Sequence, residues 1–190
     1  MNTPQKHLAA LAVASAAALA VLPGAWAQDD SDAARLDALF VELAEPDRTD
    51  WERVEGEIIR LWSRSGSVSM DLLLRRGNEA MENENYEQAL EHLSALVDHA
   101  PQFAEGWNAR ATVYFLLGEY TLSISDVEHV LALEPRHFGA LAGLGFMFEE
   151  MGDNRRALAA LLAARSINPN RTNISESINR LERETGAADL

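Results

Sequence analysis

The chain has 190 residues, with 30 Asp and Glu against 16 Lys and Arg for a formal net charge of −14, and it contains no cysteine. A surface this acidic repels phosphate backbones and anionic lipids, which argues against binding to nucleic acid or to a membrane surface and favours a neutral or basic protein partner. Without cysteine, disulfides, thiol nucleophiles and thiolate metal sites are excluded, and the length corresponds to about one domain.

The N-terminal stretch has the pattern of an export signal. After a basic start, an apolar run of 15 residues covers positions 8–22, which is shorter than the roughly 20 residues that a membrane-spanning helix needs. The triplet Ala25-Trp26-Ala27 then supplies the small-x-small pattern of a cleavage site. We expect residues 1–27 to form a signal peptide that is cleaved after Ala27 and leaves no stable membrane anchor. An uncleaved membrane anchor is the alternative.

Two amphipathic segments follow, Asp32 to Ala44 and Trp51 to Arg64, split by the turn sequence Glu45-Pro46-Asp47. Apolar residues recur in both at the three-to-four spacing of a helix face. We interpret residues 28–69 as a degenerate hairpin and linker that cap the first unit of the array described next.

Prolines recur with a period of 34 residues, at Pro101, Pro135 and Pro169. Alignment on that period places residues of similar size in the columns Leu73, Trp107, Leu141; Gly77, Ala111, Gly145; Ala80, Tyr114, Phe148; Ala89, Ser123, Ala157; and Leu93, Val127, Leu161. Within each unit the apolar positions have helical spacing, and a polar turn divides the unit into two helices. Each proline ends a second helix, because proline cannot continue one.

These residues and their spacing resemble the tetratricopeptide repeat, a 34-residue helical hairpin. The resemblance covers residues 70–103, 104–137 and 138–171 as three repeats, and residues 172–190 would form a C-terminal capping helix and tail. Arg76 and Arg110 depart from the pattern, because they occupy a place where the family has Leu. The implied fold is all-α, an α-solenoid in which stacked antiparallel helix pairs bury the faces that a single pair leaves exposed.

Three glycines in seven residues, Gly139, Gly143 and Gly145, raise the question of a phosphate-binding loop. Their order does not match a dinucleotide fingerprint or a P-loop, no strand is expected before them, and no lysine follows Lys6. Gly145 falls in the small-residue column, where the two helices of a repeat approach closely. Gly139 and Gly143 would instead face the concave groove, either as a bare floor for a partner's backbone or through drift at a tolerant surface.

The family geometry implies that the concave groove takes a peptide. The predicted peptide-binding residues are Leu74, Asn78, Met81, Glu105, Asn108, Thr112, Phe115, Gly139, Gly143, Phe146 and Glu149. Half of them could instead pack neighbouring repeats together. Family members that grip acidic chaperone tails use a clamp of cations and amides, and only Asn78 matches it here, because Leu74, Ala109, Gly139 and Gly143 fill the other places. Acidic residues at the rim therefore favour a basic or neutral segment.

Candidates for catalysis and metal binding are few. His92 and His99 lie seven residues apart on one predicted helix, whereas helical metal ligands are usually three or four apart. Ser65-Gly66-Ser67 lacks the frame of a nucleophile elbow and is typical of a linker. We expect no catalytic residue, no metal and no cofactor.

The chain is also similar to small exported tetratricopeptide proteins of alphaproteobacteria, through the segments "LWSRSGS", "MDLLLRRG" and "EGWNARATVYF". This resemblance implies a role in the periplasm or the cell envelope and adds a compartment more than a mechanism. Our leading hypothesis is a non-enzymatic periplasmic scaffold whose concave groove binds a peptide segment of a cell-envelope protein. The alternatives are an assembly protein that acts through its helical faces, as a homo-oligomer or complex subunit, and, third, a metal-dependent hydrolase. The oligomeric state and the identity of the partner stay open at this point.

Overall fold

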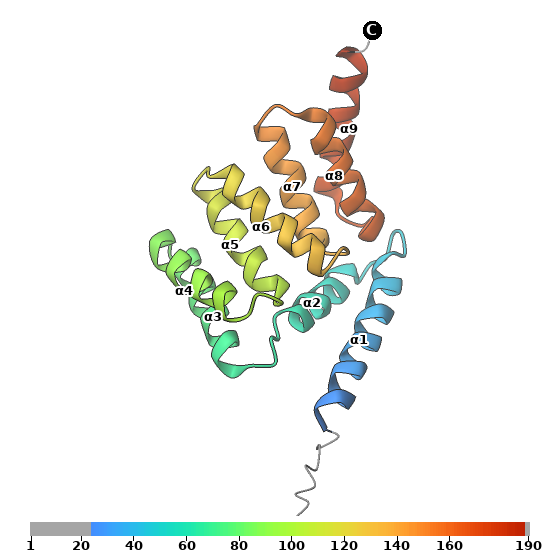
Figure 1. The fold of residues 1–190 in the computed structure, drawn as a ribbon. Helices are drawn as coiled ribbons and strands as arrows, with labels where there is room; N and C mark the ends of the chain where they lie inside the picture. The colour runs from blue at the N-terminus through green and yellow to red at the C-terminus, as the bar shows by residue number, and fades with distance from the viewer. Residues whose placement is uncertain (1–23, 189–190) are drawn as a thin grey trace, which may run out of the picture.

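The computed structural model describes residues 24–188, and within that range every regular element is an α-helix. The predicted signal peptide lies outside the described residues except for its last four positions. The helices are α1 (Gly24–Leu43), α2 (Trp51–Trp62), α3 (Val68–Glu82), α4 (Tyr86–His99), α5 (Ala104–Leu116), α6 (Tyr120–Leu133), α7 (Phe138–Glu150), α8 (Asn154–Ile167) and α9 (Thr172–Ala188) (Figure 1). Among these helices, none is long and apolar enough to span a membrane.

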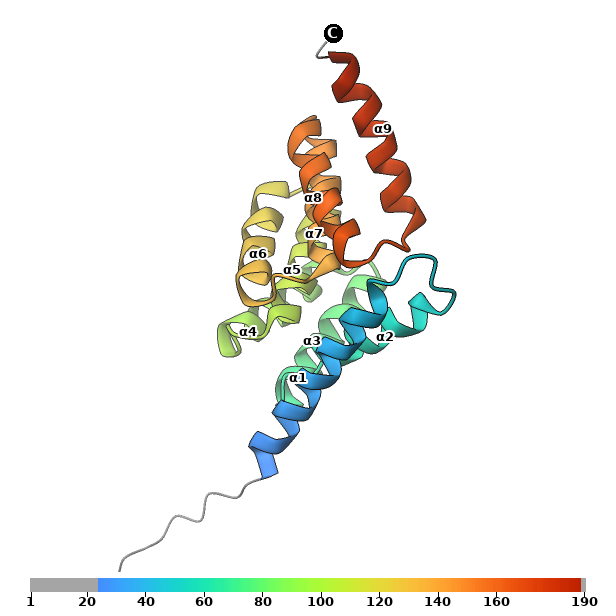
Figure 2. The same ribbon diagram turned by 90° about the vertical axis from the view of Figure 1, so that its right-hand side faces the viewer.

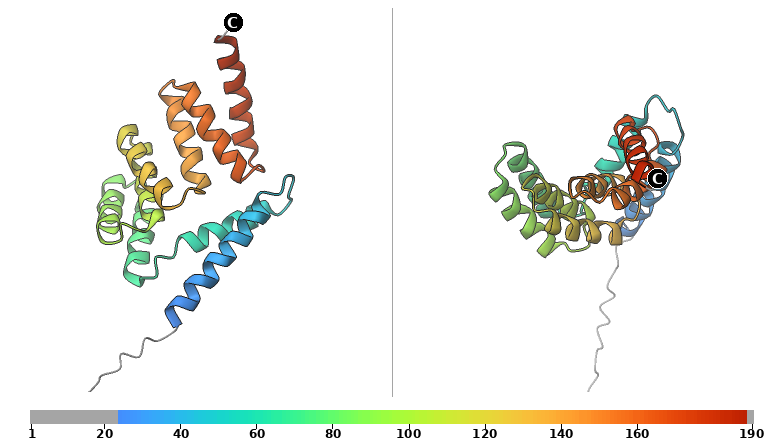
Figure 3. Two further views of the ribbon diagram at one scale, coloured as in Figure 1. Left: turned by 45° about the vertical axis from the view of Figure 1, so that its right-hand side comes forward. Right: turned by 90° about the horizontal axis from the view of Figure 1, so that it is seen from above.

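Helices α3 to α8 form three antiparallel pairs that stack along an arc, which is visible from above in Figure 3. The second helices end at His99, Leu133 and Ile167, two residues before the periodic prolines. Helix α9 follows the last pair and buries Ile174, Ile178 and Leu181 in one core cluster with residues of α7 and α8. The predicted all-α solenoid is confirmed.

Small residues allow the two helices of each pair to approach closely. A Cβ atom added to Gly77 would lie 2.5 Å from the Leu93 side chain, and one added to Gly145 would lie 2.6 Å from Leu161. In the middle pair the place of these glycines is taken by Ala111, which is 3% exposed and whose carbonyl accepts a hydrogen bond from the Ser123 hydroxyl over 2.7 Å. The small-residue column is therefore a requirement of packing within each pair.

The N-terminal hairpin α1–α2 does not cap the first repeat, contrary to our expectation for residues 28–69. Figure 2 shows the turn between α1 and α2 next to the loop between α8 and α9. Its apolar residues form one core cluster with Phe138, at the start of α7, and Ile167, at the end of α8. The expectation failed because the hairpin covers the loops between repeats, which no periodicity along the sequence indicates. Helix α1 also begins at Gly24, earlier than the predicted Asp32.

Polar contacts fix the hairpin to the loop between α8 and α9. The Glu55 carboxylate, on a residue only 8% exposed, accepts hydrogen bonds from the Arg171 guanidinium and from the Asn168 amide at 2.8 Å. The Asn170 amide in turn donates to the backbone carbonyls of Leu43 and Glu45, both over 3.1 Å. The two ends of the described chain are thus joined through side chains that are buried or half-buried.

Candidate binding groove

A small apolar pocket lies between α5 and α7, the first helices of the second and third repeats. Its volume is about 130 Å³. The lining residues are Asn108, Ala111, Thr112, Phe115, Ser123, Val127, Gly139, Ala140, Gly143 and Met147. Five residues of the predicted peptide-binding set, from two repeats, are therefore brought together around one cavity. We call this cavity the groove pocket.

The two glycines keep the groove pocket open. A Cβ atom added to Gly143 would have no heavy atom within 4 Å, and one added to Gly139 would meet only the His137 ring, at 3.5 Å or more. Packing therefore requires glycine at neither position, in contrast to Gly145 on the same helix. One repeat earlier, the place of Gly143 is taken by Ala109, which is buried in the core. The two glycines thus leave free the space that side chains at these positions would occupy.

Three polar side chains, those of Asn108, Thr112 and Ser123, lie in an otherwise apolar lining. The Asn108 amide donates to Glu105 Oε1 over 3.4 Å, and the Thr112 hydroxyl donates to the Asn108 carbonyl over 3.0 Å. Because the Asn108 side-chain oxygen is an acceptor, it can pair with a backbone N–H of a ligand. The apolar walls, which include Phe115 and Met147, suit an aliphatic side chain of moderate size.

The predicted residues at the N-terminal end of the groove do not join the pocket. Leu74 is 4% exposed and belongs to the core between α3, α4 and α5. Met81 packs against the same core, and Asn78 is half-buried on α3. The prediction that Leu74 lines the groove is therefore wrong. Leu74 is a core residue, because α5 covers it.

The predicted residues at the C-terminal end are held by the core and by α9. Phe146 packs against the core cluster of α7, α8 and α9. Glu149 forms an ion pair of 2.6 Å with Arg180 of α9. The capping helix thus engages this end of the groove, which leaves the space between α5 and α7 as its open section.

Sequence reasoning missed His137, whose ring lies beside Gly139 of the groove pocket, and Trp62, which stacks on that ring. His137 is 3% exposed and caps α7, because its Nδ1 accepts the Ala140 backbone N–H over 3.1 Å. Its ring stacks on Trp62 of α2 with centroids 4.3 Å apart. A polar residue just before an apolar helix start is a capping signal and could have identified His137. Nothing in the sequence pairs it with Trp62.

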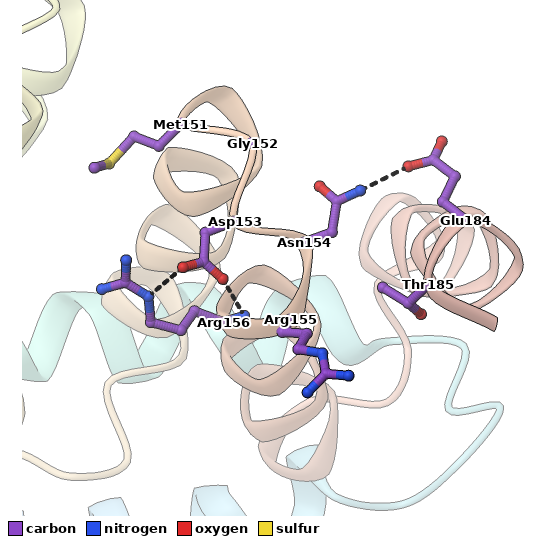
Figure 4. Close-up of a pocket in the computed structure, with 8 residues that line it drawn as sticks. All are labelled: Met151, Gly152, Asp153, Asn154, Arg155, Arg156, Glu184 and Thr185. Carbon is purple, nitrogen blue, oxygen red and sulfur yellow. Dashed lines mark hydrogen bonds and ion pairs between the residues drawn. The ribbon is translucent and has the colours of Figure 1, made fainter. Parts of the chain in front are cut away.

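A larger, polar cleft of about 480 Å³ lies between the α7–α8 turn and the end of α9 (Figure 4). Asp153 accepts hydrogen bonds from the backbone N–H and the Nε of Arg156, at 3.0 and 2.7 Å, and Asn154 donates to Glu184 over 3.1 Å. Asn154 and Glu184 bond to each other across the cleft, whereas Asp153 and Arg156 bond to each other at the start of α8, and the cleft is open to solvent. We therefore place the candidate site in the groove pocket.

Asp153 makes the start of α8 sensitive to pH. The backbone N–H of Arg156, and then its guanidinium, hold the pKa of Asp153 below its ordinary value. A lowered carboxyl pKa stabilises the fold above the unfolded pKa, about 3.9, and that stability is lost as the pH falls through the folded value. We expect Asp153→Ala to lower the urea midpoint at pH 7. The difference in urea midpoint between this variant and wild type should shrink below about pH 4. Asp153→Asn, which keeps the capping acceptor without the charge, should show no such loss on acidification.

Within residues 24–188, no group of three or more His, Asp or Glu side chains is placed to hold a metal ion. His92 and His99 both lie on α4, with the seven-residue separation that the sequence gives them.

Comparisons with known proteins agree with this architecture. The family model described as "Tetratricopeptide repeat" matches residues 104–137. A TPR repeat-containing protein of Rhizobium etli is 37% identical over 150 residues, which cover 77% of this chain and 72% of that protein.

Among solved structures, the first TPR of Spaghetti (RPAP3) bound to an HSP90 peptide has a TM-score of 0.60 at 18% identity, covering 62% of this chain and 94% of that one. The Yersinia enterocolitica type III secretion chaperone SycD, in complex with a peptide of the translocator YopD, has a TM-score of 0.60 at 14% identity, covering 63% and 96%. At these identities the likeness shows the fold alone.

Proposed function

Because the chain belongs to the tetratricopeptide repeat family, we propose that it is a non-enzymatic scaffold that binds a peptide segment of a cell-envelope protein in its groove. The fold is typical of protein–protein interaction scaffolds, some of which bind peptides. Two of the similar structures are complexes with peptides, one of HSP90 and one of a translocator.

The groove pocket is the single observation that carries this proposal. It combines an aliphatic-sized cavity with Asn108 and Thr112, and it is open because Gly139 and Gly143 lack side chains. An extended segment would insert one apolar side chain there and place its backbone against the amide. The net charge of −14 favours a segment whose flanking residues are basic or neutral.

We propose the periplasm as the compartment, on the basis of the N-terminal apolar run and the triplet Ala25-Trp26-Ala27. N-terminal sequencing of the protein isolated from a periplasmic fraction should give Gln28 as the first residue. A protein that keeps residues 1–27 and sediments with membranes would contradict the proposed cleavage and location.

Selection of random peptides displayed on phage against the immobilised protein tests the groove. We expect the selected peptides to share an aliphatic residue, and we expect Gly143→Leu to weaken their binding by at least about tenfold in titration calorimetry, because the new side chain fills the cavity. Ala159→Leu, at an exposed position of α8, is the matched control and should bind as wild type does. Equal binding by all three proteins would refute a role for the pocket.

Exposed apolar side chains favour one alternative, assembly through the helical turns. Leu116, Leu117 and Leu122, at the α5–α6 turn, and Met151, at the α7–α8 turn, are 45–49% exposed. If the phage selection yields no peptide while Leu117→Ser reduces capture of partner proteins from an envelope extract, this assembly function replaces peptide binding.

A further inference from the structure

The N-terminal hairpin reaches the groove through one aromatic contact. Trp62, the last residue of α2, lies parallel to the His137 ring, with an interplanar angle of 10°. Phe40 and Phe138 also contact the indole, at centroid distances of 5.8 and 5.3 Å. The indole is thus held on the hairpin side by Phe40 and presents one ring face to His137.

His137 connects Trp62 to α5 through a hydrogen bond to Glu105. Since its Nδ1 accepts the Ala140 N–H, the proton of the neutral ring is on Nε2. Nε2 therefore donates to Glu105 Oε2, 3.2 Å away. The same ring is the nearest group to a Cβ built on Gly139, which lines the groove pocket.

Glu105 completes the connection to the pocket. Its other oxygen, Oε1, accepts the Asn108 amide over 3.4 Å, and Asn108 lines the cavity. The Glu105 side chain is only 14% exposed, so few alternative partners in water compete for it. Trp62, His137, Glu105 and Asn108 form a continuous series of contacts, which we call the hairpin-to-groove path.

We propose that Trp62 and His137 are positioning residues for peptide binding, so that the N-terminal hairpin, and not the repeats alone, determines how the groove presents Asn108. This inference rests on the proposed function. With Glu105 held by His137, the Asn108 amide nitrogen is directed to Glu105 and its oxygen is left to accept a peptide N–H. Without His137, the Asn108 side chain is free to rotate, and part of the binding free energy is spent on ordering it.

The substitution His137→Asn separates this role from folding. Asparagine is among the best N-cap residues, so the start of α7 is kept, while the stacking on Trp62 and the bond to Glu105 are removed. We expect the phage-selected peptide to bind about three- to tenfold more weakly to His137→Asn, and to Trp62→Leu, which keeps an apolar side chain in the hairpin core. Glu105→Gln keeps the size of the side chain but only one of the two acceptor oxygens that the path uses, and it should weaken binding less than Glu105→Ala does.

A double-mutant cycle tests whether His137 affects peptide affinity through Glu105. In a Glu105→Ala background, His137→Asn should cause no further loss of affinity, because the path is already broken. A purely structural role of His137 would give the same loss in both backgrounds, and that result would overturn the proposal.

Measurements on the protein without peptide test the positioning role even if no peptide is selected. Because the chain has no cysteine, spin labels can be attached at single cysteines introduced for Glu91 on α4 and Ala159 on α8, both exposed, to confirm that His137→Asn leaves the arc unchanged. The Asn108 side-chain amide signals, followed by NMR, should then show slow exchange with water in wild type and fast exchange in His137→Asn. Unchanged exchange would refute the positioning role, whereas absence of selected peptides with changed exchange would refute only the proposed function.

Discussion

Replacing Leu161 by alanine is expected to lower the free energy of unfolding by about 2–5 kcal/mol, because a fully buried leucine leaves a cavity when it is truncated. Leu161 is 0% exposed in the core shared by α7, α8 and α9. Gly145→Ala should lower it by about 1–3 kcal/mol, since the new methyl group would lie 2.6 Å from Leu161 and 3.3 Å from the Ala157 carbonyl.

The two substitutions should compensate each other. In the double variant the methyl group of residue 145 occupies space that the leucine has vacated, so the combined loss is expected to be smaller than the sum of the single losses. Urea denaturation of the four proteins measures this coupling. Gly143→Ala is the control on the same helix: with no heavy atom near its Cβ, it should be neutral or stabilising by up to about 1 kcal/mol. If the two losses in free energy of unfolding simply add, residue 145 and Leu161 are not in the close contact that the structure shows.

Glu55→Ala is expected to cost roughly 1.5–3 kcal/mol, the range for hydrogen bonds to charged groups. The loss leaves the Arg171 guanidinium and the fully buried Asn168 amide without their shared acceptor. Arg171 keeps partial access to water, at 28% exposure of its side chain, which holds the expected value below that of a completely buried pair.

Hydrogen exchange followed by mass spectrometry locates this effect. Amides of α1 and α2 should exchange faster in Glu55→Ala, while those of α3 and α4 should not change. Glu52→Ala, at an exposed position of the same helix, is the matched control and should resemble wild type. Faster exchange throughout the chain would show that the hairpin does not detach as a unit.

The repeats could be predicted because each one repeats the same local requirements. Helical spacing, the proline period and the small residues at Gly77 and Gly145 all recur every 34 residues, and packing between neighbouring units uses those same columns. The pair Gly139 and Gly143 could also be assigned to the groove, since position within a repeat determines which way a residue faces.

The docking of the N-terminal hairpin could not be predicted, because it depends on contacts between residues that the 34-residue period does not relate. Trp62 reaches His137, and Glu55 reaches Arg171, over sequence separations that no repeat pattern encodes. The prediction for Leu74 is wrong for a related reason. Asn108 occupies the same position in the second repeat and lines the pocket, whereas Leu74 in the first repeat is covered by the next helix. The size of the residues on the next helix decides between the two.

The docking of α1–α2 onto the α8–α9 loop alters how the array should unfold. In an ordinary solenoid each unit touches only its neighbours, so terminal units can open one at a time. Here hydrogen bonds join residues 113 and 127 positions apart, and they tie the first helices to the last. Such closure raises the contact order, which slows folding, and we expect it to hold α1 and α2 in place until their contacts with the α8–α9 loop break, so that the N-terminal hairpin opens as one unit and not helix by helix.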